Sequence, residues 1–220
     1  MNKMKNTENE KKYLAFFILM LSLTSCLFVI TQIISSTMNY DSKTAHILSY
    51  FTMQSNIIII IWTMALSLYI LTGKKSYKFS MDINLASSFT TYILVTGLVY
   101  WAILVPVYFA PDATWLFSTS NIWLHTFSPV ISIIVLKYVK SQNDGIEIKP
   151  KLPLFFIYPV LYIIFALINA ANRIFLYPMF NPNLLGGWIG VAICLIVMIV
   201  LFTGLYLLLL YGPNRKKKIN

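Results

Sequence analysis

Six stretches of about twenty predominantly apolar residues dominate this chain of 220 residues. A helix needs about 20 such residues to cross the hydrocarbon core of a bilayer, whereas a barrel strand needs only about ten. The chain is 58% hydrophobic and 11% charged, although a soluble domain usually has about 25% charged residues. The sequence therefore predicts an all-α, polytopic membrane protein, a bundle of six transmembrane helices. The predicted spans are residues 13–34, 50–72, 83–105, 119–139, 153–172 and 186–211.

Charged residues and turn formers bound these stretches. Gly73 follows the second, Asp82 precedes the third as a candidate helix cap, and Ser118 or a neighbouring hydroxyl precedes the fourth. The first stretch is longer than a usual signal-peptide core and no small-residue cleavage site follows it, so we expect a retained helix. The predicted organisation is a cytoplasmic segment 1–12, a transmembrane domain 13–211 and a basic cytoplasmic tail 212–220.

The basic residues are distributed unequally between the two sides. Fifteen of the seventeen lysines and arginines lie in or beside the N-terminal segment, the tail, and the connections after the second and fourth spans. Only Lys43 and Arg173 lie on the other side. Cytoplasmic loops carry the excess of Lys and Arg, so both termini are predicted in the cytoplasm and the protein in the cell membrane. The net charge of +10 is thus interpreted as a topology signal, and no nucleic-acid partner is expected.

The cysteine and histidine content does not predict a metal site. Cys26 and Cys194 lie inside separate apolar stretches, which is neither a zinc pattern nor a CxxC pair. We expect them to act as small buried hydrophobic residues. With two histidines and seven scattered carboxylates, we predict no metal and no cofactor.

Three pairs of polar residues, each four positions apart, lie near the outer ends of predicted spans. Residues four apart share one helix face, so each pair forms a polar stripe. Together the stripes predict a small polar pocket that opens toward the outer leaflet. The pairs are Thr52 with Asn56, Asn121 with His125, and Asn169 with Arg173.

A hydroxyl beside an imidazole is the minimal unit of nucleophilic acyl transfer, because the imidazole takes the proton as the hydroxyl attacks. Thr52 and His125 are the candidates, at similar depth in different spans. The amide of Asn121 is a candidate to orient the ring, and Gln54 or Asn56 to stabilise an oxyanion. No carboxylate lies near these residues in sequence, and there is no G-x-S-x-G elbow.

Other interpretations remain open. A threonine in a membrane helix usually bonds to its own i−4 carbonyl, and a buried histidine often serves structure alone. The same pocket is also compatible with a non-enzymatic binder or carrier of a lipid or small amphipathic molecule, and the whole chain with a structural or assembly protein. An ion-coupled transporter is disfavoured, since no Asp or Glu lies inside a span. Further candidate pocket residues are Trp123, Tyr177 and Asn181.

Four segments resemble the bacterial six-helix branch of the androgen-induced transmembrane protein family. They are "YFTMQSN" in the second span, "WLHTFSPV" in the fourth, "YPVLYIIFALI" in the fifth and "YPMFNP" after it. Animal members of that family are intramembrane threonine hydrolases of fatty acid esters of hydroxy fatty acids. The resemblance implies that Thr52 is the nucleophile and His125 its partner. It also implies a lipid substrate that reaches the site from the bilayer. "MQSN" after Thr52 departs from the animal pattern, so the substrate stays open.

Overall fold

The computed structural model describes residues 2–38, 47–109, 114–143 and 148–212. Outside these ranges lie parts of three predicted loops, one of which contains Lys43, and the tail from residue 213. The described chain is helical and has no strand within those ranges, as predicted. Six of its helices are long and apolar enough to cross a membrane, which confirms the six-span prediction. They are Glu8–Met38, Phe51–Thr72, Ile83–Tyr108, Thr119–Gln142, Leu152–Ala171 and Trp188–Tyr211.

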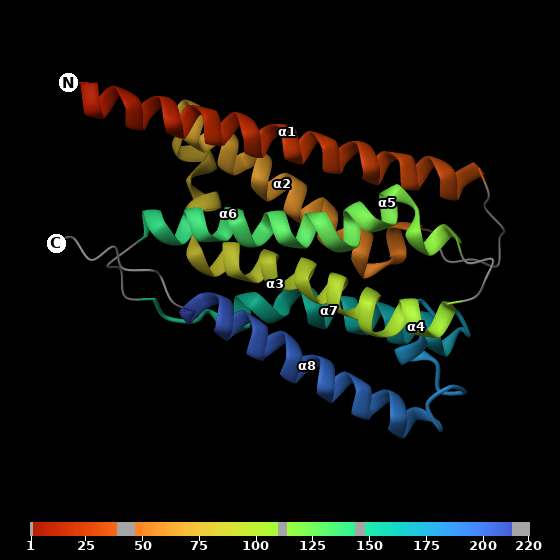
Figure 1. Ribbon diagram of the computed structural model, residues 1–220. Coiled ribbons are helices and arrows are strands. Elements are labelled where there is room, and N and C mark those ends of the chain that lie inside the picture. Colours follow the sequence, from red (N-terminus) through yellow and green to blue (C-terminus); the bar gives the residue numbers. More distant parts are fainter. Residues whose placement is uncertain (1, 39–46, 110–113, 144–147, 213–220) are drawn as a thin grey trace.

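The six spans form one bundle in which the third span is central (Figure 1). The first two spans are α1 (Asn2–Met38) and α2 (Phe51–Thr72). The third is α3 (Ile83–Val99) continued by α4 (Val105–Tyr108), and the fourth is α5 (Thr119–Ile122) continued by α6 (Ser128–Gln142). The last two are α7 (Leu152–Ala171) and α8 (Trp188–Tyr211). Helix α3 packs on α2, α6, α7 and α8.

The two largest groups of buried side chains in the described chain lie on different sides of α3. One fills the space between α1, α2, α3 and α6 around Trp62, Leu66 and Ile93. The other lies between α3, α7 and α8 around Tyr92, Phe155 and Tyr206, whose rings contact one another. Since lipid is as apolar as these side chains, close packing rather than water exclusion favours this assembly.

The helix ends satisfy their polar groups with the predicted caps. Asp82 accepts hydrogen bonds from the N–H groups of Asn84 and Leu85 at 2.8 and 3.1 Å, and its other oxygen pairs with Lys151 at 3.0 Å. Gly73 ends α2 with φ of 65°, a conformation that glycine adopts without strain. At the end of α8, the ammonium of Lys140 donates to the carbonyls of Leu209 and Gly212.

The start of α1 and the end of α8 lie at the same end of the bundle, which we call the basic end (Figure 1). The opposite end, which carries α4 and α5, we call the site end. Short 3-10 turns join spans at both ends: Lys75–Met81 at the basic end, and Ile47–Ser49, Thr114–Phe117 and Pro178–Phe180 at the site end. An even number of spans requires this shared end, whichever side of a membrane it faces.

Candidate functional site

Two π-helical turns face each other at the site end of the bundle. One is Tyr100–Leu104 in the third span and the other is Trp123–Phe127 in the fourth. Each ends two residues before a proline, Pro106 or Pro129, and a proline has no N–H to continue the regular i−4 pattern. Single π turns inside α-helices occur frequently at functional sites. The prolines thus mark the places where both spans change their helical pitch.

The imidazole of His125 projects from the second of these turns and is buried, with 7% of the residue exposed. Its Nδ1 lies 2.8 Å from the main-chain carbonyl of Asn121. A carbonyl only accepts hydrogen bonds, so Nδ1 must carry the proton. In the neutral ring, Nε2 then holds the lone pair that a general base needs. The ring is therefore oriented by the main chain of Asn121, which corrects the prediction that the Asn121 side-chain amide would hold it.

Close helix packing places His125 against the third span. Its ring stacks on Tyr100, with centroids 3.9 Å apart. Gly97 lies beneath the same turn, and a Cβ at this position would lie 2.7 Å from the carbonyl oxygen of His125. A side chain at position 97 would push the two spans apart, so glycine is what permits this approach.

Thr52 lies in the first turn of α2 and is half-buried. Its hydroxyl is 3.3 Å from the hydroxyl of Tyr177, which also accepts the Thr52 N–H at 3.3 Å. Tyr177 comes from the connection between α7 and α8, and burial raises the pKa of its hydroxyl. The phenol therefore stays protonated at neutral pH and can donate a hydrogen bond. The Thr52 hydroxyl thus contacts a distant segment of the chain, which is more than the purely local role that the sequence left open.

Asn56 ties the second span to the fourth at the depth of the site. Its amide nitrogen donates to the carbonyl of Thr52 at 2.9 Å and to the carbonyl of Leu124 at 3.3 Å. Because one nitrogen reaches both carbonyls, the main chain at Thr52 and the main chain next to His125 lie close together. The predicted meeting of these two spans at matching depth is thus observed at the level of the backbone.

Thr52 and His125 line one cavity of about 340 Å³. This volume lies in the range of ligand pockets, about 300–1,000 Å³. Tyr50, Tyr108 and Trp115 add aromatic walls, and Tyr100, Asn121 and Tyr177 also line it. Among the described residues, no hydrogen bond joins the Thr52 hydroxyl to His125, so a substrate or a water has to lie between them for a proton to pass.

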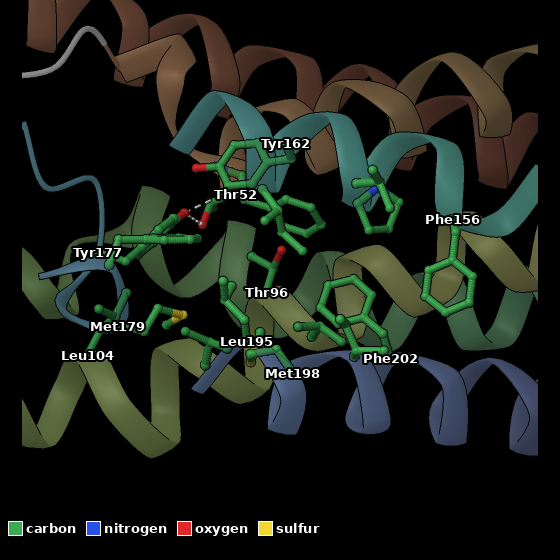
Figure 2. A pocket seen from close by; sticks show the side chains of 18 residues that line it. Thr52, Thr96, Leu104, Phe156, Tyr162, Tyr177, Met179, Leu195, Met198 and Phe202 are labelled. Carbon is green, nitrogen blue, oxygen red and sulfur yellow. Dashed lines mark hydrogen bonds between the residues drawn. The ribbon is translucent and has the colours of Figure 1, made fainter. Parts of the chain in front are cut away.

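Thr52 and Tyr177 also line a second cavity, which is narrower and apolar (Figure 2). Figure 2 shows Thr52 and Tyr177 at one end of it and Phe156 and Phe202 at the other. Thr52, Leu104 and Tyr177 are shared by both cavities and form the partition between them. We call the first the imidazole cavity and the second the apolar cavity.

No family, no curated protein and no solved structure matches this chain. The resemblance proposed from the four short segments therefore stays a prediction. Any inference about function rests on the geometry of the site itself.

The other predicted pocket residues do not line either cavity. Gln54 donates to the Leu48 carbonyl and accepts from the Tyr158 hydroxyl, so its amide is already occupied. The amide nitrogen of Asn56 likewise donates to main-chain carbonyls. Neither amide lines the imidazole cavity, so the predicted oxyanion donors do not face it. Trp123 faces α1, where its indole N–H donates to Ser25 and its ring stacks on Phe28.

The predicted third polar stripe does not reach the site either. Asn169 bonds to the carbonyl of Phe165 in its own helix. Arg173 is exposed and takes φ of 63°, which ends α7. Asn181 accepts the N–H of Asn183 in a local turn. None of these three residues lines either cavity.

Sequence reasoning missed Tyr100 and Gly97, which support the imidazole. The signal that points to Tyr100 is a proline six residues later, matching the spacing between Trp123 and Pro129 in the fourth span. Cys26 and Cys194 are half-buried free thiols rather than fully buried ones. Within the described ranges, no three metal-binding side chains lie close enough to hold an ion.

Proposed function

We propose that this protein is an intramembrane hydrolase of lipid esters, with Thr52 as nucleophile and His125 as general base. The observation that supports this most is the imidazole cavity, which Thr52 and His125 line together. The hydrogen bond from His125 Nδ1 to the Asn121 carbonyl leaves Nε2 as the proton acceptor. A cavity of about 340 Å³ holds an ester group and a water together.

The chemistry follows the two-step pattern of covalent catalysis. The Thr52 hydroxyl attacks the ester carbonyl carbon, and its proton passes to Nε2 of His125, directly or through one water. The tetrahedral intermediate collapses, and the alcohol leaves with the proton from Nε2. A water then loses a proton to Nε2 and attacks the Thr52 ester. Collapse of the second intermediate returns that proton to Thr52 and releases the fatty acid.

Tyr177 is the hydroxyl donor best placed for the oxyanion. Its OH lies 3.3 Å from the Thr52 hydroxyl, whereas the amides of Gln54 and Asn56 have other partners. Because burial raises the pKa of Tyr177, the phenol remains a donor throughout the neutral range. A donor aimed at developing negative charge is worth about 10²–10³ in rate in acyl-transfer enzymes.

Labelling with a fluorophosphonate probe tests the nucleophile. Purified protein in lipid nanodiscs should be labelled, Thr52→Ser should retain labelling and Thr52→Ala should lose it. His125→Phe keeps an aromatic ring against Tyr100 but removes the base, so it should lose labelling while staying folded. Thr96→Ala is the matched control, because Thr96 lines the apolar cavity but uses its hydroxyl on Tyr92 and Ser55. Labelling that persists in Thr52→Ala would falsify the assignment.

Turnover is then measured with fatty acid esters of hydroxy fatty acids, the substrates that the resemblance implies. A single-chain ester of a simple alcohol serves as a second substrate. Release of fatty acid by the wild type and its loss in Thr52→Ala is the expected result.

A second candidate function is a lipid binder without turnover. It is favoured by one observation, that the partner of the Thr52 hydroxyl is a phenol rather than the imidazole. Binding of ester that persists in both Thr52→Ala and His125→Phe, with no release of fatty acid by the wild type, would support it.

We further propose that the protein lies in the cell membrane with its basic end in the cytoplasm. The lysines at that end include Lys74, Lys75, Lys78 and Lys151. The site end then faces outward, and the lipid substrate comes from the outer leaflet.

A further inference from the structure

The apolar cavity has the shape of a channel. Its lining residues on α7 run from Phe156 to Ile163, and those on α8 from Leu195 to Phe202. Each set spans two helical turns, or about 10 Å. A volume of about 100 Å³ spread over that length is narrow. Such a space favours a slender unbranched chain over a ring or a branched group.

The wall of the channel is suited to hydrocarbon. Of the eighteen described residues that line it, four carry a hydroxyl: Thr52, Thr96, Tyr162 and Tyr177. Thr96 and Tyr162 use their hydroxyls on neighbouring groups, Thr96 on Ser55 and Tyr162 on the Ser49 carbonyl. Pro159 would leave the Phe155 carbonyl unpaired, but the Tyr92 hydroxyl donates to it at 2.6 Å. The polar contacts offered to a ligand are thus concentrated at the Thr52 end.

The channel opens sideways to the bilayer between α7 and α8. Phe155 of α7 packs on Phe202 and Tyr206 of α8 toward the basic end, and the cavity lies between the two helices nearer the site end. Val160 of α7 and Ile199 of α8 line the cavity and are 46% and 44% exposed, so they lie at its mouth. A hydrocarbon chain can therefore pass from lipid into the channel without crossing water.

The direction of the channel matches that of a lipid chain. It runs from Thr52, near the site end, toward Phe156 and Phe202 deeper in the bundle (Figure 2). Lipid chains likewise run from the headgroup level toward the bilayer centre. A lipid in the leaflet at the site end would place its polar part at Thr52 and its chain along the channel.

We propose that the apolar cavity binds the unbranched acyl chain of a single-chain ester, which slides in between α7 and α8. Its carbonyl lies at the partition of Thr52, Leu104 and Tyr177, and its alcohol part lies in the imidazole cavity beside His125. The placement of the scissile bond rests on the proposed function, whereas binding of the chain does not.

Photo-crosslinking tests the channel. Full-length protein in phospholipid nanodiscs is irradiated with a fatty acid methyl ester that carries a diazirine near the chain end, and adducts are mapped by peptide mass spectrometry. Adducts are expected on the channel side of α7 and α8, at Phe156, Met198 or Phe202. An excess of the unlabelled ester should remove them, and exchange of the nanodisc phospholipid should not. Adducts that follow the phospholipid instead would overturn the assignment to a single-chain ester.

A matched pair of substitutions on α8 distinguishes the channel from the general lipid surface. Ile199→Trp blocks the mouth and should lose most of the channel adduct. Val200→Trp is the control, because Val200 is the next residue, is 66% exposed and does not line the cavity. Both positions face lipid, so neither substitution should unfold the chain, and a thermal melt checks this. Equal adduct in Ile199→Trp and Val200→Trp overturns the proposal.

The same samples separate this inference from the proposed function. Thr52→Ala should keep the channel adduct while releasing no fatty acid. A channel adduct in a wild type that hydrolyses no ester contradicts the hydrolase and leaves the channel in place. Hydrolysis by a wild type whose adducts map only to the imidazole cavity contradicts the channel and leaves the hydrolase in place.

Discussion

The imidazole of His125 lies almost flat on the phenol ring of Tyr100, with the ring centroids 3.9 Å apart and the planes 19° apart. The two residues come from π-helical turns in different spans. The Tyr100 hydroxyl donates in turn to the Leu116 carbonyl, so the platform under the imidazole is itself anchored. With Nδ1 bound to Asn121, the ring is held on one face and one edge, and no hydrogen bond to Nε2 is seen among the described residues.

Gly97→Ala should disturb this arrangement. The new Cβ would lie 2.7 Å from the His125 carbonyl and 3.2 Å from Pro129, and the carbonyl belongs to the backbone. We expect a loss of about 1–3 kcal/mol in the free energy of unfolding, typical of overpacking, and reduced fluorophosphonate labelling. Gly204→Ala is the control, because a Cβ there meets nothing within 4 Å, and alanine in a helix is stabilising. Equal stability of the two variants in thermal melts would contradict the close-approach argument.

Tyr177→Phe should lower the rate of fatty acid release from the ester by about 10²-fold, because it removes the proposed oxyanion donor beside Thr52. Tyr50→Phe is the control. Tyr50 lines the same cavity, and no hydrogen bond joins its hydroxyl to Thr52 in the described chain. The measurement is kcat and KM for both variants. A rise in KM with kcat unchanged would assign Tyr177 to binding alone.

Asn121→Ala should leave the chemistry largely intact. The main-chain carbonyl of Asn121 orients His125, whereas its side chain bonds to the Trp115 carbonyl at 2.7 Å and to Gln32 at 3.3 Å. Loss of these contacts should lower stability by about 1 kcal/mol with little effect on labelling. If Asn121→Ala lost labelling as fully as His125→Phe while melting like the wild type, the side-chain amide would have a direct role.

Asp82 should make stability depend on pH in the acidic range. Burial opposes ionisation of this carboxyl, but the hydrogen bond to Lys151 and the N–H groups of Leu85 and Asn84 outweigh it, so its pKa is lowered. A lowered folded-state pKa means that the stabilisation is complete above the ordinary value of 3.8 and is lost as pH falls through the folded-state pKa. Asp82→Ala should cost about 1 kcal/mol at neutral pH and flatten the acidic part of the profile.

Asp82→Asn serves as the comparison for that variant. The amide oxygen still caps α3 but no longer pairs as an anion with Lys151, so most of the stability at neutral pH should remain. Thermal melts from about pH 2 to pH 7 measure all three proteins, because the predicted loss lies below the ordinary pKa of 3.8. A wild-type profile that is as flat as that of Asp82→Ala would contradict a contribution from the charged carboxylate.

The orientation can be tested by cysteine labelling in cells. In a variant with Cys26 and Cys194 replaced by alanine, Lys75→Cys at the basic end should react with a membrane-impermeant maleimide only after lysis. Trp115→Cys at the site end should react in intact cells, since Trp115 is 55% exposed. The reverse pattern would place the site in the cytoplasm.

The sequence by itself was sufficient for the spans and their caps. Apolar length decides whether a helix crosses a bilayer, and Asp82, Gly73 and Ser118 act on their own helix ends, so neighbouring residues carry the information. The sequence also predicted that Thr52 and His125 lie at similar depth, because each is a similar distance from the outer end of its own span.

Only the tertiary structure decided which polar groups face the site. Three predicted pocket residues lie near the site end but bond to other partners: Gln54, Trp123 and Asn169. The rotation of each helix about its axis decides this, and the periodicity within one helix does not specify the rotation of the next. The contact between Thr52 and Tyr177 joins residues 125 positions apart, and the stacking of His125 on Tyr100 depends on the close approach at Gly97. Packing between spans sets these relations because in lipid no solvent contrast selects one buried face over another.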